Sequence, residues 1–102
     1  MVLSDDEKED LKGELGRCFR GDPSVEKVVV FGSFLTSSAP NDLDVAVFGD
    51  RSESYLPLAL EYRRRARSVA RKIPIDIFPV RKENLRGTFL KEIQDGEVIY
   101  ER

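Results

Sequence analysis

The sequence predicts an α/β (α+β) domain, in which helices pack on a mixed β-sheet of about four strands. Two observations favour this class. Short runs of β-branched or alternating apolar residues recur along the chain, and longer segments with apolar residues at helical intervals separate them. The 102 residues suffice for one domain, so we expect a single domain spanning residues 1–102.

The first predicted element is a helix from about Asp5 to Phe19. Ser4 and Glu7 have the spacing of a capping box, and Leu11 and Leu15 recur at the interval that places them on one helix face. A Gly-Asp-Pro sequence follows, and it ends the helix.

Two strands are predicted next, joined by a loop. Val25 to Phe31 contains a short β-branched apolar run, which fits a strand buried on both faces better than a helix. The serine-rich segment from Gly32 to Asn41 is predicted to be a loop. Asp42 to Phe48 then alternates, so apolar side chains share one face of the strand and the other face carries Asp42, Asp44 and Ala46.

The second half of the chain begins with a long predicted helix, from Ser54 to Lys72. Pro57 is tolerated there because it falls in the first turn. Ile73 to Pro79 alternates again, and its two prolines fit a strand near an edge of the sheet or one whose ends lie outside the ladder.

The C-terminal part completes the predicted order of elements. A third main helix is expected over Glu83 to Gln94, broken or weakened at Gly87. A turn at Asp95-Gly96 follows, and Glu97 to Glu101 is predicted to be a short closing strand.

Composition excludes several kinds of chemistry. The chain has no histidine and a single cysteine, Cys18, so it offers no Ser-His triad, no zinc-type histidine site and no internal disulfide. The net charge of −2 gives no reason to expect generic nucleic-acid binding, and no apolar run approaches the roughly 20 residues that span a bilayer. The acidic N-terminal segment is unlike a secretory leader. We therefore expect a cytoplasmic protein that does not bind membranes.

Three aspartates occupy strand positions where apolar residues are usual. Asp42 and Asp44 are two residues apart, so both carboxylates lie on one face of their strand. Asp76 interrupts the third predicted strand, from which it could join the same face. Carboxylates this close repel one another unless a divalent cation lies between them, and oxygen ligands without His or Cys select Mg²⁺ or Mn²⁺ over zinc.

Gly32 and Ser33 come directly after the buried strand. Glycine lets a phosphate approach the backbone closely, and serine offers a hydroxyl and an amide N–H. Taken singly, each feature has an ordinary alternative: the Gly-Ser pair is a turn, the Asp-x-Asp alternation is a solvated strand face, and Asp76 protects an edge strand from aggregation. Together, and in this order, they favour a phosphate-binding turn beside a metal site.

These residues also carry a resemblance to a known family. The stretch Val29-Val30-Phe31-Gly32-Ser33, followed by Asp42-Leu43-Asp44, resembles the Gly-Ser…Asp-x-Asp motif of the DNA polymerase β-like nucleotidyltransferase superfamily. The smallest branch of that superfamily is the minimal nucleotidyltransferase (MNT) family, often encoded beside a HEPN-domain protein as a toxin–antitoxin pair. The resemblance continues through Ile75-Asp76-Ile77 to the segment at 95–100, and thus covers most of the chain from about Val25. It implies the polymerase β palm-like fold.

The resemblance also implies a function for each residue of the motif. Gly32 and Ser33 would bind the triphosphate of a nucleotide. Asp42 and Asp44 would bind two Mg²⁺ or Mn²⁺ ions, and Asp76 would bind one of them and help deprotonate the attacking hydroxyl, so these three are the expected catalytic residues. The implied reaction is transfer of a nucleoside monophosphate, with AMP from ATP expected, to a hydroxyl of a protein or RNA. In the toxin–antitoxin setting the acceptor would be a HEPN-domain partner.

Two departures from the family pattern support alternative functions. Only the segment from Phe34 to Asn41 separates Ser33 from Asp42, which is shorter than usual in the family, and no basic residue closely follows the Gly-Ser pair. These departures fit a catalytically weak nucleotide-binding or partner-neutralising module that retains the fold. A nucleotide-binding subunit that needs a second polypeptide to recognise the acceptor is a further alternative.

Basic residues are concentrated in the long predicted helix. Because their positions go round the helix, we expect a solvated face rather than one stripe, with docking of a protein partner as the better functional alternative and RNA binding as another. The helix carries Arg63, Arg64, Arg65, Arg67, Arg71 and Lys72, and further candidate phosphate contacts are Arg81, Lys82, Arg86 and Lys91. The sequence leaves open the nucleotide base, the acceptor and whether the chain forms a homo-oligomer.

Overall fold

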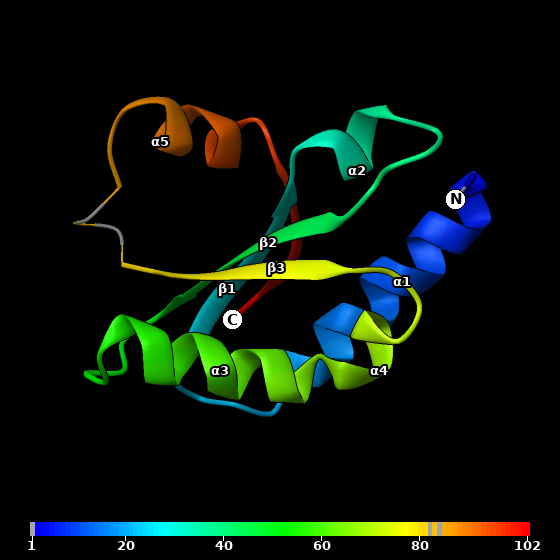
Figure 1. The fold of residues 1–102 in the computed structure, drawn as a ribbon. Coiled ribbons are helices and arrows are strands. Elements are labelled where there is room, and N and C mark those ends of the chain that lie inside the picture. The colour runs from blue at the N-terminus through cyan, green and yellow to red at the C-terminus, as the bar shows by residue number, and fades with distance from the viewer. Residues whose placement is uncertain (1, 82, 84) are drawn as a thin grey trace.

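The computed structural model describes residues 2–81, 83 and 85–102, and it contains a four-stranded mixed sheet with helices packed on it (Figure 1). This architecture confirms the predicted fold class. The elements in chain order are α1 (Asp5–Phe19), β1 (Val25–Phe31), α2 (Ser33–Thr36), β2 (Leu43–Gly49), α3 (Tyr55–Arg65), α4 (Arg67–Ala70), β3 (Ile75–Val80), α5 (Gly87–Gln94) and β4 (Glu97–Glu101).

The strands lie in the order β3-β2-β1-β4. β1 pairs antiparallel with both β2 and β4, whereas β2 and β3 are parallel. The parallel pair requires a crossover, and α3 and α4 provide it on one face of the sheet. β3 is an edge strand, which is one of the two alternatives that its prolines left open.

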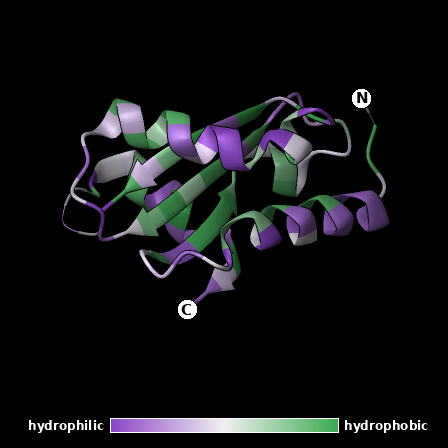
Figure 2. Ribbon diagram, turned by 90° about the horizontal axis from the view of Figure 1, so that it is seen from below, coloured by the Kyte–Doolittle hydropathy of each residue, from purple (hydrophilic) through white to green (hydrophobic). Residues whose placement is uncertain are grey.

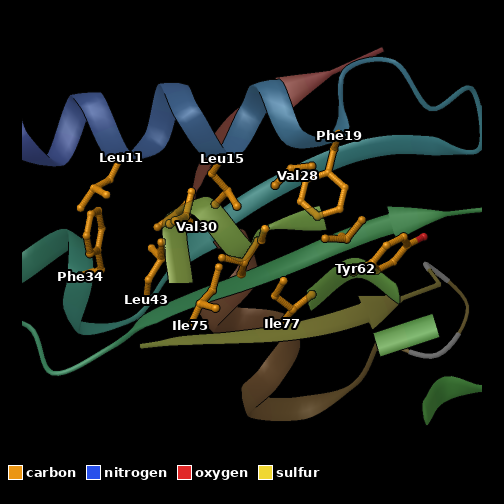
Figure 3. Packing of buried hydrophobic residues seen from close by; sticks show 14 of the residues in the cluster. Leu11, Leu15, Phe19, Val28, Val30, Phe34, Leu43, Tyr62, Ile75 and Ile77 are labelled. Carbon is orange, nitrogen blue, oxygen red and sulfur yellow. The ribbon is translucent and has the colours of Figure 1, made fainter. Parts of the chain in front are cut away.

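Apolar side chains form a layer on each face of the sheet. On the face covered by α1, α3 and α4, Leu11, Leu15 and Phe19 of α1 point toward the strands (Figure 3). On the other face, α5 packs over a smaller layer that contains Val29, Phe31, Ala46, Phe48, Val80 and Ile93. Figure 2 shows the central strands mainly in the hydrophobic colour, consistent with burial on both sides. The uninterrupted apolar run of β1 follows from this burial.

The bounds of α1, β1 and β4 agree with the predicted ones. At the start of α1, the capping box predicted from Ser4 and Glu7 is present: the Glu7 N–H donates to Ser4 Oγ at 3.1 Å, and the Ser4 N–H donates to Glu7 Oε1 at 2.9 Å. β2 and β3 begin slightly later than predicted, at Leu43 and Ile75. Within the described residues, no helix combines the length and apolar character needed to cross a bilayer.

Two helix predictions are wrong, for local reasons. The helix predicted over Ser54–Lys72 breaks at Ala66, whose N–H is shared between the carbonyl oxygens of Tyr62 and Arg64. The helix predicted over Glu83–Gln94 begins only at Gly87, the residue at which a break or weakening was expected. Gly87 has φ +61°, a left-handed conformation that does not continue an α-helix.

The loop predicted from Gly32 to Asn41 contains the short helix α2. Phe34 anchors this turn, since its side chain is fully buried and lies in the larger apolar layer with Leu11 of α1 (Figure 3). The Lys8 ammonium also lies over the Phe34 ring, 5.5 Å from its centroid. Burial of one aromatic side chain thus orders a segment whose other residues are mostly small and polar.

Candidate metal and nucleotide site

Three aspartates converge at one end of the sheet. Asp42 directly precedes β2, Asp44 is the second residue of β2, and Asp76 is the second residue of β3. One carboxylate oxygen from each of the three lies within 4.8 Å of those of the other two. The structure therefore brings together the three acids that the sequence singled out.

The parallel register of β2 and β3 causes this convergence. Asp44 is paired with Asp76, and their neighbours on both sides, such as Leu43 and Ile75, face the larger apolar layer. Alternation along a strand then sends both carboxylates to the opposite face. The Leu43 N–H donates to the Pro74 carbonyl at 2.9 Å, which continues the pairing to the end of the sheet where the acids lie.

The electrostatics of the site favour a cation. Burial raises the pKa of the Asp44 carboxyl, and the negative charges of Asp42, Asp76 and Glu92 raise it further, to about 6. A divalent cation would reverse this effect, because its positive charge offsets the repulsion among the carboxylates. Since the donors are carboxylate oxygens, the site fits Mg²⁺ or Mn²⁺ better than a softer metal.

Glu92 was missed by the sequence analysis. It is an exposed residue of α5, and it adds negative charge near Asp44. No sequence spacing links it to the aspartates. Its position near the site depends on how α5 packs across the sheet, and this packing is a tertiary property.

Gly32 and Ser33 lie directly beside the acids. Gly32 has φ +80°, and a β-carbon at this position would lie 2.7 Å from Asp44 Oδ2. The preceding residue, Phe31, is paired with Asp44 in the sheet. Ser33 is exposed at the start of α2, where the Leu35 N–H donates to the Gly32 carbonyl at 3.2 Å. Only glycine allows this turn to pass so close to the central acid.

The predicted phosphate contacts are not all at this site. The candidates were Arg81, Lys82, Arg86 and Lys91. Arg81 follows the far end of β3, about 16 Å from Asp76 along the strand. Its guanidinium donates to the backbone carbonyl of Arg51 at 2.6 Å, away from the acids. Lys82 lies outside the described residues, and both Arg86 and Lys91 are exposed.

The basic residues of α3 and α4 have two different environments. Arg65 pairs with Asp22 and Glu61, and Lys72, beyond α4, pairs with Glu14 at 2.7 Å. The six basic residues thus do not gather in one stripe, which agrees with the prediction. Three of them, Arg63, Arg64 and Arg67, line one shallow hollow together with Leu60 and Ala70.

Comparison with known proteins agrees with this geometry. The chain has the fold of a polymerase β nucleotidyltransferase domain, and its structural neighbours are MNT antitoxins in HEPN–MNT complexes. One neighbour is from a tri-AMPylated Shewanella oneidensis HEPN toxin in complex with an MNT antitoxin, with 15% identity, a TM-score of 0.66, and coverage of 93% of this chain and 73% of that one. No curated protein matches the chain by sequence.

Two further solved structures show the same likeness. A MntA–HepT toxin–antitoxin structure matches with 14% identity and a TM-score of 0.64, covering 92% of this chain and 73% of that one. A toxin–antitoxin structure with AMP-PNP matches with 17% identity and a TM-score of 0.67, covering 89% of this chain and 73% of that one. At these identities the likeness shows the fold alone. Residues 14–102, however, match the family described as polymerase beta, nucleotidyltransferase, and the chain therefore belongs to that family.

Proposed function

We propose that this chain is a metal-dependent nucleotidyltransferase that transfers AMP from ATP to a hydroxyl group of a HEPN-domain partner protein. The observation that carries the proposal is the convergence of the Asp42, Asp44 and Asp76 carboxylates within 4.8 Å, beside the Gly32 turn. Two structural neighbours support the choice of nucleotide and acceptor, since one contains a tri-AMPylated HEPN toxin and another contains AMP-PNP.

Each residue of the site has a proposed function in this reaction. Asp42 and Asp44 would hold two divalent ions, and Asp76 would hold one of them. Bound there, Mg²⁺ or Mn²⁺ would lower the pKa of an acceptor hydroxyl and would neutralise charge on a leaving pyrophosphate. The exposed hydroxyl of Ser33 and the open backbone at Gly32 would bind the triphosphate.

The proposed step is an in-line displacement at the α-phosphorus of ATP. The acceptor oxygen forms a bond to this phosphorus, the bond from phosphorus to the oxygen that bridges to the β-phosphate breaks, and pyrophosphate leaves with the electron pair. The proton of the acceptor hydroxyl passes to the carboxylate of Asp76, which is exposed and can release it to water. Positioning and electrostatics do most of the work in this kind of transfer, so a small domain can carry it.

The test is a transfer assay with ATP labelled at the α-phosphate, Mg²⁺ and a purified HEPN-domain protein, with RNA as a second acceptor. We expect the label on the protein, and a loss of about 100-fold or more in an Asp42→Asn, Asp44→Asn variant. Asp10→Asn, an exposed acid of α1, is the matched control and should transfer normally. Equal transfer by the double variant and the control would refute metal-dependent catalysis at this site, and label on RNA alone would refute the proposed acceptor.

One observation favours a second function, that of a catalytically weak module that neutralises its partner by binding. The helix that follows the phosphate-binding turn is Ser33-Phe34-Leu35-Thr36, so α2 contributes no cation to offset the triphosphate charge. This alternative predicts that the Asp42→Asn, Asp44→Asn variant still suppresses the activity of a HEPN-domain partner. The catalytic proposal predicts that suppression requires ATP and is lost in the variant.

A further inference from the structure

The outer face of α3 carries unusual exposed apolar side chains. Leu58 and Tyr62 face the apolar core, and helical periodicity then places Leu56 and Leu60 on the side that faces solvent. Leu56 is 66% exposed and Leu60 is 50% exposed. Among the described residues, five large apolar side chains are exposed, and two of them share the solvent-facing side of this short helix. Such clustering distinguishes an interaction surface from scattered exposed residues.

Three arginines continue this face toward α4. Arg63, Arg64 and Arg67 line a hollow of about 410 Å³ with Leu60 and Ala70. Within the part of the chain that the structure describes, none of the three forms an ion pair, although Arg65 on the same helix does. Their charges are therefore available to groups from outside the molecule.

We propose that this surface, the α3–α4 stripe (Leu56, Leu60, Arg63, Arg64 and Arg67), binds an acidic amphipathic helix of a partner protein. Arginine is enriched at the centres of protein interfaces. The apolar half of the stripe matches apolar side chains of such a helix, and the guanidinium groups match carboxylates that flank them.

Charge and shape favour this occupant over two others. A two-fold contact between copies of the chain through the stripe would bring arginines of both copies together, which is unfavourable. A nucleic-acid strand would use the arginines but leave the exposed leucines without apolar contacts.

The stripe is separated from the acidic site by the sheet. α3 and α4 cover the face with the larger apolar layer, whereas Asp44 and Asp76 point to the opposite face. A partner bound to the stripe therefore leaves the acids accessible, and binding does not require the metal. Partner binding at the stripe is thus separate from the proposed reaction and independent of catalysis.

The test uses a synthetic fluorescent peptide that forms a helix with leucines on one side flanked by glutamates, together with a scrambled peptide of the same composition. Fluorescence anisotropy measures Kd for wild type, Leu60→Ser and Arg64→Glu, and circular dichroism verifies that each variant is folded. Arg20→Glu makes the same charge change at an exposed residue outside the stripe. Asp42→Asn, Asp44→Asn tests independence from the proposed catalytic site.

We expect each stripe variant to weaken binding of the amphipathic peptide about tenfold or more, since each loses a central contact. Arg20→Glu and the double aspartate variant should keep the wild-type Kd. Equal binding of the scrambled peptide, or an unchanged Kd for Leu60→Ser, would overturn the proposal. So would a wild-type dimer in light scattering that Leu60→Ser dissociates, or binding of single-stranded polyuridylate that depends on Arg64 and not on Leu60.

Discussion

The Gly32 backbone and the Asp44 carboxylate are so close that a β-carbon on residue 32 would lie 2.7 Å from Asp44 Oδ2. No real β-carbon tolerates this distance, so a side chain at residue 32 and the present position of Asp44 exclude each other. The Gly32 turn and the central acid of the candidate site are therefore one structural unit.

Replacing Gly32 by alanine should damage both stability and metal binding. We expect Gly32→Ala to lower the free energy of unfolding by about 2–3 kcal/mol, because it combines a strained φ of +80° with displacement of Asp44. Gly87→Ala is the matched control, since Gly87 has φ +61° but open space around it, and should cost about 1 kcal/mol. Urea denaturation and Mg²⁺ titration measure both effects. Equal losses of metal affinity in the two variants would contradict this explanation.

The metal-free protein should become less stable as pH rises from 4 to 7. Burial and neighbouring negative charges raise the pKa of Asp44 from 3.8 to about 6, so the folded state holds this proton more tightly than the unfolded state. The stabilisation of the folded state by this proton is complete below pH 4 and is lost as pH rises through 6. The free energy of unfolding falls by at most about 3 kcal/mol, and by less because solvent screens the charges. Denaturation at several pH values in EDTA should show the decline in wild type, and a flat profile for Asp44→Asn would verify its origin.

Mg²⁺ should stabilise the protein, and acid should oppose it. An ion that binds only the folded state at 100 times its Kd raises the free energy of unfolding by about 2.7 kcal/mol. Protons compete for the same carboxylates, so Mg²⁺ affinity should fall below about pH 6, the pKa of Asp44. Thermal melts with and without Mg²⁺, at several pH values, measure both the stabilisation and its loss in acid. A similar rise in Asp42→Asn, Asp44→Asn would place the ion elsewhere.

Asp22 should determine stability at the acid end of the pH range. Burial raises the pKa of its carboxyl, but hydrogen bonds from Ser24 and Arg65 outweigh burial and lower the pKa to about 2. The resulting stability is present above pH 4 and is lost as pH falls from 4 to 2, by about 1–2 kcal/mol. Asp22→Asn should remove this acid-side loss. If the variant and wild type lose stability in parallel over this range, another carboxylate is responsible.

The turn before β4 should tolerate no side chain at Gly96. A β-carbon there would lie 2.6 Å from the Val30 carbonyl oxygen and 3.1 Å from that of Ile93, both backbone atoms that cannot move aside. We expect Gly96→Ala to cost about 2–3 kcal/mol, as in an overpacked core. Gly21→Ala, with open space around it, should change the free energy of unfolding by less than about 0.5 kcal/mol. Chemical denaturation of both variants would decide this.

The elements that the sequence predicted well are those governed by local pattern. The capping box and the apolar spacing of Leu11 and Leu15 are sufficient to define α1, and alternation along β2 and β3 places Asp44 and Asp76 on one face. The convergence of the acids also needed β3 to lie next to β2. The parallel pairing of β2 and β3 places these strands side by side. The crossover through α3 and α4 makes the pairing parallel.

The features that the sequence did not predict depend on packing. Phe34 stabilises α2 within a polar segment because its ring enters the core. A helix of four residues is too short to show a periodic pattern in the sequence. Gly87 was expected to break or weaken a helix, but the sequence did not show that its positive φ determines where the helix begins. Glu92 reaches the acidic site through the position of α5, which only the folded sheet determines.

The placement of Asp76 on an edge strand has a consequence for thermal inactivation. β3 hydrogen-bonds to β2 alone, so fraying of its first residues breaks far fewer interactions than global unfolding does. Such fraying moves Asp76 away from Asp42 and Asp44 while the rest of the sheet stays folded. Warming should therefore abolish cation binding at a temperature where the core is still folded. Any activity that needs the cation would then be lost below the melting temperature.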